Sequence, residues 1–534
     1  MTNRTYKSEL DSTPLLDFAS ELQQRYEASA SPDERKQRGQ FFTPHAVARF
    51  MAGLFSTVPK RFRVLDPGAG TGTLAVAVCE RILRLRSPRN VQLLLYETDR
   101  GIVPLLDDNM KRCRSVLKAA NHHLTYEIRE GDFILSNPQA FQQQMLFDLS
   151  SPVDRVDAVI MNPPYFKIQK SSEYARLMEH IVHGQPNIYA LFMALSAEML
   201  HPGGELVAIT PRSFCSGLYF RSFRRWFFKR MSLRHIHLFE SRKDTFPGAN
   251  VLQESVITHS QRSANPPLTI TISTSFGCDL PPKLANRQMP TTKIIDDTCG
   301  NMVIRIPESS EDTRIMELVE SWPQRFIEHG LRVSTGPVVM FRATEFLCHS
   351  HNGKNTAPLL SVHNVRPFKT VWPVHKNDKP TAFEVCSKSL TRRLLLPTRN
   401  YVLLRRFSAK EERRRLTASC LLKPTEFGPY VALENHLNYV YHSKRELTDD
   451  ETFGLAALFN SALLDRYFRM LSGNTQVNAT ELRTMNFPNL KTVARIGRRI
   501  KHLRQFIAAK TEGIVLDELG INGNLHRYLT ELSS

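Results

Sequence analysis

Six short apolar runs alternate with amphipathic stretches between residues 62 and 260, and this rhythm limits the possible folds more than any other feature. The runs are rich in Val, Ile and Leu, and read RVLDP, VQLLLYET, DAVIMNPP, GELVAITP, LRHIHLFES and ESVITHS. Strands that are buried on both faces and separated by helical segments form a mostly parallel sheet covered by helices. The sequence therefore predicts an α/β domain over residues 37–275.

The flanking regions have different patterns. Residues 9–30 carry apolar positions at helical spacing, so residues 1–36 are expected to form a helical segment. The stretch SQRSANPPLTITIST (260–274) predicts a Pro-rich break and one more strand, at the sheet edge or the domain junction. Farther along the chain the segments are irregular, Pro recurs and Arg residues cluster, which predicts an α+β domain over residues 295–534.

A glycine-rich turn, VLDPGAGTG (64–72), joins the first run to an Ala- and Val-rich helix. Gly68, Gly70 and Gly72 let the backbone bend and approach a ligand, and the helix directs its N–H groups at that ligand. A structural turn or a dinucleotide site would look similar. The preceding Asp66 suits a cationic amine or a sulfonium better than a pyrophosphate.

Two later runs also end in acids. Glu97, with Asp99 beside it, follows LLLY, and Asp132 follows REG. Each acid could simply cap the next helix. At the carboxyl edge of a doubly wound sheet, however, the acids would share one crevice, where a carboxylate commonly accepts hydrogen bonds from ribose hydroxyls. Together they favour an adenosine-bearing cofactor.

The run DAVIM ends in the tetrapeptide Asn162-Pro163-Pro164-Tyr165. The Asn162 oxygen and the Pro163 carbonyl can accept hydrogen bonds from the two N–H bonds of a planar amine, and the fixed φ of proline limits the motion of that carbonyl. Tyr165 offers a ring on which a base can stack, worth ~1–3 kcal/mol. The alternative is a rigid turn with an exposed aromatic residue.

In the order GQFFTP, VLDPGAGTG, LLLYETD, GDFI and MNPPYF, these motifs resemble the gamma class of S-adenosylmethionine-dependent DNA amino-methyltransferases over residues 37–260. The stretch from RSF to ESVI is similar to adenine methyltransferases of type II restriction–modification systems, and LFNSALLDRYFRMLSGNTQVNATELRTMNFP matches the end of these enzymes loosely. The resemblance implies a Rossmann-like domain with a mixed, mostly parallel sheet, followed by a target-recognition domain. It also implies S-adenosylmethionine as cofactor and double-stranded DNA as partner.

Carried over by position, the resemblance assigns the methionine end of the cofactor to two segments. Thr43 and Pro44 would hold the carboxylate, and Phe41 and Phe42 would line that pocket. Asp66 and Gly68 would lie by the methionine amino group and backbone, and Pro67, Gly70 and Gly72 of the same loop are further cofactor-binding candidates.

The same comparison implies the remaining roles. Glu97 would bind the ribose hydroxyls, Asp132 the adenine amine, and Phe133 would pack on the adenine ring. The catalytic residues would be Asn162, Pro163, Pro164 and Tyr165. Phe246 in TFPGAN would be a second aromatic wall, opposite Tyr165, for a flipped base.

The formal charge of +19 favours a polyanionic partner, although ribosomal or acidic membrane surfaces would also explain it. In FRSFRRWFFKR (220–230) the aromatic residues are expected in the core and only the arginines as possible phosphate contacts. The C-terminal candidates for DNA contacts are Arg392, Arg393, Arg405, Arg406, Asn474, Gln476 and Asn478. Solvated helix faces, and a capped loop leading into a helix at Thr480-Glu481, are the alternatives.

The remaining features concern location and partners. The eight cysteines include no C-x-x-C pair, so we expect reduced thiols and no metal site. The N-terminus lacks an apolar signal-peptide core and no run approaches eighteen apolar residues, so a cytoplasmic protein without a membrane partner is expected. A cognate restriction endonuclease would act on the same DNA site without needing to bind this chain, which is expected to be a monomer.

The leading hypothesis is a sequence-specific DNA adenine-N6 methyltransferase that protects host DNA. Methylation of cytosine N4, of RNA or of a protein glutamine are the alternative reactions, and a non-catalytic specificity subunit is the alternative without chemistry. Asn162 favours adenine, because cytosine-N4 enzymes more often have Ser at that position. The sequence offers no convincing PD-(D/E)-x-K arrangement of a fused nuclease, because ESRK (240–243) lacks the preceding Pro-Asp and lies on the methyltransferase scaffold.

Overall fold

The computed structural model divides into two compact units, residues 1–305 and 306–534. It describes the chain except for residues 1–13, 30–41, 143–153, 183, 185–186, 241–253, 279, 281–283, 285, 298–299, 354, 376–378, 386–392, 409–411, 424–427, 473–475 and 534. Strands β10 (Ile295–Asp296) and β11 (Val303–Ile304) belong to the first unit. Arg224 helps to hold them there, because its Nε donates a hydrogen bond to the Asn301 carbonyl (2.9 Å).

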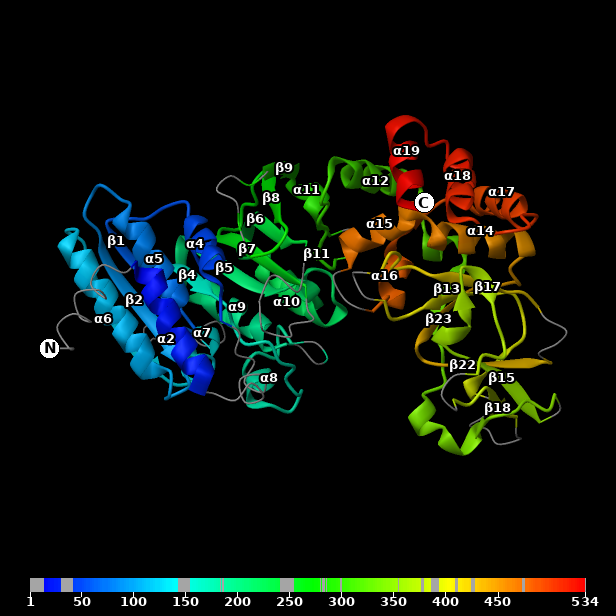
Figure 1. Ribbon diagram of the computed structural model, residues 1–534, viewed down its shortest axis with the longest axis horizontal. Coiled ribbons are helices and arrows are strands. Elements are labelled where there is room, and N and C mark those ends of the chain that lie inside the picture. Colours follow the sequence, from blue (N-terminus) through cyan, green and yellow to red (C-terminus); the bar gives the residue numbers. More distant parts are fainter. Residues whose placement is uncertain are drawn as a thin grey trace. The chain divides into compact units, whose positions relative to one another are not determined.

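The first unit is built on a nine-stranded sheet in the order β3-β2-β1-β4-β5-β7-β6-β8-β9 (Figure 1). Its strands are β1 (Arg61–Asp66), β2 (Asn90–Glu97), β3 (His123–Glu130), β4 (Val156–Met161), β5 (Leu200–Pro211), β6 (Met231–Phe239), β7 (Ser255–Arg262), β8 (Thr269–Ser275) and β9 (Asn286–Pro290). Neighbours from β3 to β5 are parallel, β7 is antiparallel to β5 and β6, β8 is parallel to β6, and β9 is antiparallel to β8. The predicted mixed, mostly parallel Rossmann-like sheet is confirmed.

The strand order reverses between β1 and β4, which lie side by side although β2 and β3 intervene in sequence. Ligands of open α/β sheets bind at such a switch point, outside the carboxyl ends of the strands. The strand predicted at the sheet edge or the domain junction, β8, lies one place inside the sheet edge, because β9 pairs with its outer side.

Helices cover both faces of this sheet. Helices α2 (Leu15–Ser29), α4 (His45–Gly53), α5 (Thr73–Leu83) and α6 (Val103–Ala119) share one apolar core with alternate strand residues such as Val64, Leu93 and Ile160. Strand residues one position along point to the other face. There Met161 contacts Ser196 of α9 (Ile188–Met199), which is apolar and buried along its whole length.

The shorter elements of the first unit are α7 (Gln139–Gln142), α8 (Glu173–Leu177), η1 (Arg212–Cys215), η2 (Leu218–Phe220), α10 (Arg221–Phe227) and α11 (Thr291–Ile294). The aromatic residues predicted to lie in the core around α10 are buried: Phe220, Phe223, Trp226 and Phe227. Among all described residues, no helix combines the length and apolar character needed to cross a membrane.

The second unit is α+β and contains two larger sheets, in the orders β13-β23-β20-β21-β17-β16 and β14-β18-β15-β22-β19. Its strands are β12 (Gln324–Arg325), β13 (Leu331–Thr335), β14 (Leu347–Cys348), β15 (Thr356–Leu360), β16 (Val365–Arg366), β17 (Phe368–Thr370), β18 (Ala382–Glu384), β19 (Leu395–Pro397), β20 (Tyr401–Arg405), β21 (Ala418–Leu421), β22 (Tyr430–Leu433), β23 (Leu437–His442) and β24 (Asn486–Phe487). Its helices are α12 (Ser310–Ser321), α14 (Asp449–Asn460), α15 (Ala462–Leu471), α16 (Ala479–Thr484), α17 (Leu490–Ile500), α18 (Ala508–Glu518) and α19 (Gly523–Ser533). Helices α14 and α17 approach closely where Gly454 and Gly497 leave room for the facing backbone.

Candidate functional site

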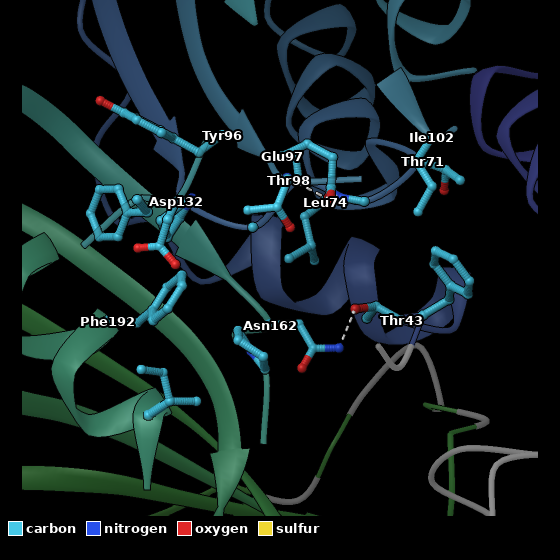
Figure 2. Close-up of a pocket in the computed structure, with 18 of the residues that line it drawn as sticks. Thr43, Thr71, Leu74, Tyr96, Glu97, Thr98, Ile102, Asp132, Asn162 and Phe192 are labelled. Carbon is cyan, nitrogen blue, oxygen red and sulfur yellow. Dashed lines mark hydrogen bonds between the residues drawn. The ribbon is translucent and has the colours of Figure 1, made fainter. Parts of the chain in front are cut away.

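A cavity of about 440 Å³ opens at the carboxyl ends of the central strands of the first unit, within the size range of ligand pockets. It lies at the switch point of the sheet, at the start of α5 (Figure 2). Its lining consists of Phe42, Thr43, Pro67, Gly68, Ala69, Gly70, Thr71, Thr73, Leu74, Tyr96, Glu97, Thr98, Ile102, Gly131, Asp132, Phe133, Asn162, Pro164, Phe166, Tyr174, Ile188 and Phe192. Strand ends predicted from separate parts of the sequence therefore meet in one site.

The glycine loop contains two backbone positions whose conformation favours glycine. Gly70 (φ +55°) and Gly72 (φ +91°) lie in the left-handed region, and a Cβ on Gly72 would come within 2.7 Å of Leu106 Cδ1. The Gly70 N–H donates to Glu97 Oε2 (2.8 Å), which ties the loop to the end of β2. Gly72 is the N-cap of α5 and does not line the cavity, whereas Gly68 and Gly70 do.

Asp66 lies behind the loop and is only 1% exposed. Its Oδ1 accepts a hydrogen bond from the Gly68 N–H (3.3 Å), and its buried Oδ2 has no partner among the described residues. Burial raises the pKa of this carboxyl to about 7, the Gly68 hydrogen bond opposes the shift, and the charge of Glu97 adds to it. A buried carboxyl with an unpaired oxygen suits a cationic group better than an anion.

Glu97 lines the cavity and is held by backbone donors. Its Oε1 accepts hydrogen bonds from the N–H groups of Thr98 (2.9 Å) and Asp99 (2.8 Å), in addition to the Gly70 bond to Oε2. Burial raises the pKa of the Glu97 carboxyl, and these hydrogen bonds oppose the shift. A carboxylate has about four acceptor positions, so three bonds within the protein leave capacity for a ligand hydroxyl.

Asp132, which follows the neighbouring strand β3, is also held in place. Its Oδ1 accepts hydrogen bonds from the N–H groups of Ile134 and Leu135 (both 2.9 Å), and its Oδ2 accepts one from the Tyr174 hydroxyl (2.7 Å). The next residue, Phe133, is buried and packs against Phe192 with ring centroids 5.4 Å apart. The carboxylate and the two rings together suit a flat heteroaromatic ring that carries a hydrogen-bond donor.

Asn162 projects from the end of β4 into this cavity, where Figure 2 shows its bond to Thr43, and a second bond, to Tyr165, holds the other end of its amide. Its Nδ2 donates to Thr43 Oγ1 (3.1 Å), and its Oδ1 accepts from the Tyr165 hydroxyl (2.5 Å), which also lies 3.1 Å from the Ile209 carbonyl oxygen. Burial raises the pKa of the Tyr165 hydroxyl, which keeps it protonated. An amide oxygen has two lone pairs, so the bond from Tyr165 does not by itself prevent Oδ1 from accepting a ligand N–H.

The other residues of the tetrapeptide differ in whether they line the cavity. Pro163 is buried, Pro164 lines the cavity, and Tyr165 packs edge-on against Tyr189 with centroids 6.2 Å apart. The aromatic residue of this loop that lines the cavity is Phe166, which is 37% exposed. The candidates Phe41 and Phe246 lie outside the described residues.

Several lining residues differ from those that the sequence predicts. The resemblance assigns Pro44 to the cofactor, but Pro44 serves as the N-cap of α4, whereas its neighbours Phe42 and Thr43 line the cavity. Tyr174 and Phe192 carry no predicted role, and both come from helices that follow the tetrapeptide. The sequence contains one indication that Phe192 is buried near the site, because it lies on a strongly apolar helix. It contains no such indication for Tyr174.

The second unit brings some of the DNA-contact candidates together. Phe407 pairs with Gln476 in an isolated antiparallel bridge, and the Val477 N–H donates to the Arg406 carbonyl (2.7 Å). Arg406 also donates through Nη1 to the Asn435 carbonyl (2.9 Å), and Arg405 donates through Nε (3.2 Å) and Nη2 (2.7 Å) to the Val365 carbonyl.

The remaining candidates are more scattered. Arg393 is exposed, and Asn478 is the N-cap of α16, as the capped-loop alternative proposed. Arg392 and Asn474 lie outside the described residues.

Comparison with known proteins agrees with this geometry. The model of the Eco57I restriction-modification methylase family matches residues 74–246. The chain is 33% identical over 500 residues to the type II methyltransferase M.PstI of Providencia stuartii, covering 93% of this chain and 96% of the relative. It is also 33% identical over 524 residues to the type II methyltransferase M.BsuBI of Bacillus subtilis, covering 96% and 98%.

A solved structure, the type IIL restriction-modification enzyme MmeI in complex with DNA, resembles this chain in fold. The TM-score is 0.51 at 11% sequence identity, and the match covers 100% of this chain and 75% of that chain. The cofactor is S-adenosylmethionine, and the acceptors present fit it: the unpaired Asp66 oxygen, behind the glycine loop, suits a cation, and Glu97 and Asp132, which line the cavity, suit the hydroxyl and amine donors of a nucleoside. The chain belongs to the type II methyltransferases, and its residues 74–246 match the Eco57I restriction-modification methylase family.

Proposed function

We propose that this protein transfers the methyl group of S-adenosylmethionine to N6 of an adenine in double-stranded DNA, within a site that a cognate restriction endonuclease would otherwise cut. One observation carries the proposal. Asn162 reaches the cavity directly after β4 with its amide bound by Thr43 and Tyr165. A preorganised acceptor is what a weakly nucleophilic exocyclic amine requires.

The cofactor would lie across the glycine loop with its nucleoside toward β2 and β3. Glu97 would accept hydrogen bonds from the ribose hydroxyls, Asp132 would accept one from the adenine amine, and Phe133 would pack on that ring. The positive end would lie near Asp66, whose ionised form it would favour. When bound, S-adenosylmethionine supplies an electrophilic methyl group on a sulfonium.

The residues of the tetrapeptide would then activate the target amine. Asn162 Oδ1 and the Pro163 carbonyl would accept its two N–H bonds, which favours a pyramidal nitrogen with a localised lone pair. The N–C bond forms as the C–S bond breaks, and the extra proton on nitrogen passes to water. No general base is needed before the attack, so orientation carries much of the rate enhancement.

The target base would have to leave the duplex, at a cost of a few kcal/mol, because an amine inside the stack cannot reach this cavity. Stacking on an aromatic residue offsets that cost. Tyr165 and Phe246 are the proposed partners, and Phe166 is a third candidate because it lines the cavity. The complex of MmeI with DNA and the charge of +19 support DNA as the substrate.

Recognition of the DNA sequence would belong to the second unit. Arg392, Arg393 and Asn474 remain proposed contacts, together with Gln476, which lies beside Phe407. DNA contacts are also proposed for Arg405, Arg406 and Asn478, although each forms hydrogen bonds within the second unit. These contacts would use the side-chain N–H groups that the internal hydrogen bonds leave unused.

The test is incubation of the purified protein with tritiated S-adenosylmethionine and duplex DNA of mixed sequence, followed by digestion to nucleosides. We expect the label in N6-methyladenine, and sequencing of the methylated DNA would give the recognition site. Label in N4-methylcytosine would refute adenine as the target. Parallel reactions contain RNA or protein in place of DNA. Label in either of these substrates, with none in duplex DNA, would refute DNA as the substrate.

A further inference from the structure

The segment from η1 to the end of α10 has one buried side and one exposed side. Its Phe214, Phe220, Phe223, Trp226 and Phe227 are buried in the core, whereas Leu218 is 47% exposed and Tyr219 is 53% exposed. Arg221, Arg225 and Lys229 follow directly and are not buried. Two large apolar side chains and three cations therefore share one stretch of surface, the 218–229 surface.

The cations of this segment fall into two groups. Arg224 is buried, and its Nη1 donates to the carbonyls of Phe214 (2.9 Å) and Gly217 (2.8 Å). In contrast, Arg221 and Arg225 form no ion pair or hydrogen bond with any described side chain, and the same is true of Lys229. Within the described part of the chain, the fold therefore makes no use of these three charges.

The exposed residues are presented by a rigid backbone. Arg212, at the start of η1, forms an ion pair with Glu254 (2.6 Å) in which both side chains are 3% exposed. Together with the Arg224 bonds, this pair fixes the conformation of the turn that carries Leu218 and Tyr219. A preformed surface loses little conformational entropy when a partner binds.

The 218–229 surface adjoins the catalytic loop. Phe220 stacks on Tyr189 (5.3 Å between centroids, 23° between planes), and Tyr189 packs edge-on against Tyr165. The ring of Tyr219 lies against Gly184, where a Cβ would come within 2.3 Å of it. Figure 1 shows α10 beside α9, whose first residue, Ile188, lines the cavity.

We propose that the 218–229 surface binds the DNA strand that carries the target base; this inference rests on the proposed function. Arg221 and Arg225 lie four residues apart on one helix face, about 6 Å along its axis, which spans roughly two phosphate steps of 3.4 Å. They and Lys229 contact phosphates. Leu218 and Tyr219 pack against the sugar and base faces of nucleotides next to the flipped one.

The first test is the salt dependence of duplex binding. Each lost phosphate contact lowers the slope of log K against log salt by about 0.9, so Arg221→Ala/Arg225→Ala should lower its magnitude by about 2. The control is Arg84→Ala/Arg86→Ala, which removes two arginines at the opposite end of α5 from the glycine loop and should leave the slope unchanged. An unchanged slope in the first variant, with wild-type protein that binds and methylates DNA, would overturn the inference alone.

The second test concerns the apolar part of the surface. Tyr219→Ala should lower kcat/KM for duplex DNA roughly tenfold with cofactor affinity unchanged, because base–aromatic contacts are worth ~1–3 kcal/mol. Tyr219→Phe keeps the ring and should stay close to wild type. Equal activity of Tyr219→Ala and wild type would refute the role of this ring. A wild-type protein that methylates no duplex DNA would instead refute the proposed function itself.

Discussion

Asp66 illustrates how a buried carboxyl, proposed here to face a cationic ligand group, can weaken the free protein. Its pKa is raised to about 7 by burial, above the ordinary value of 3.8. A carboxyl whose pKa is raised by folding stabilises the folded protein fully when the pH is below its pKa in the unfolded chain. This contribution is lost as the pH rises through its pKa in the folded protein. The free energy of unfolding therefore loses this contribution between about pH 4 and pH 7.

We expect Asp66→Asn to be more stable than the wild type at pH 8 without cofactor, by at most about 4 kcal/mol, since each pKa unit is worth about 1.4 kcal/mol. The difference should shrink toward pH 4, and the variant should bind S-adenosylmethionine more weakly. Urea unfolding at a series of pH values measures the first effect and calorimetry the second. Wild-type and variant curves that stay parallel over this range would contradict the account.

Asp107→Asn is the matched control. Lys111 holds the pKa of the Asp107 carboxyl below its usual range, so this group stabilises above its unfolded pKa and loses that effect as pH falls. Its replacement should therefore destabilise the protein slightly at neutral pH. The sign is opposite to that expected for Asp66.

Residues at strand ends were predictable, and residues that reach the site from helices were not. Asp66 and Glu97 end apolar runs and Asp132 follows a third predicted strand, so parallel pairing alone places them at one edge of the sheet. Tyr174 bonds to Asp132 across 42 positions of sequence, and this contact depends on the path of the chain between β4 and α9. No local pattern encodes such a path.

At the scale of elements, the glycine loop and α5 depend on one backbone conformation. Gly72→Ala should destabilise the protein by about 1–2 kcal/mol or more, because φ is +91° and the new Cβ would strike Leu106. Cofactor affinity should fall with it, since Gly70 and its bond to Glu97 belong to the same turn. Denaturation and cofactor titration measure both effects.

Gly53→Ala is the control for this substitution. Gly53 ends α4 without a positive φ, and a Cβ added there would meet no described atom within 4 Å. Alanine there should be neutral or slightly stabilising. Equal effects at positions 53 and 72 would contradict the role given to the loop.

Most strands of the first unit were predictable because they are long and apolar on both faces, as in β2 and β5, whereas the short, polar β9 was not predicted. Those of the second unit were not, since β16 has two residues and β17 has three, too few to show a period. Their pairing depends on long-range contacts, such as the register of β17 with β21.

At the scale of the whole molecule, the chain joins a sheet built for a nucleoside cofactor to a second unit of shorter strands and helices. The order of the two could be predicted, because the motifs occur in one half of the sequence. The DNA site could not, since base readout depends on which side chains enter which groove. Phe407 and Gln476 show the difficulty, because only the fold brings them side by side.

The most direct measurement is single-turnover methyl transfer to duplex DNA by Asn162→Ala, with S-adenosylmethionine binding measured in parallel. The cofactor should bind within about threefold of wild type, because Glu97, Asp132 and the glycine loop are unchanged. The transfer rate should fall by about 100-fold or more, which is the usual effect of removing one group that stabilises a transition state. Transfer at the wild-type rate would contradict the central claim that Asn162 activates the target amine.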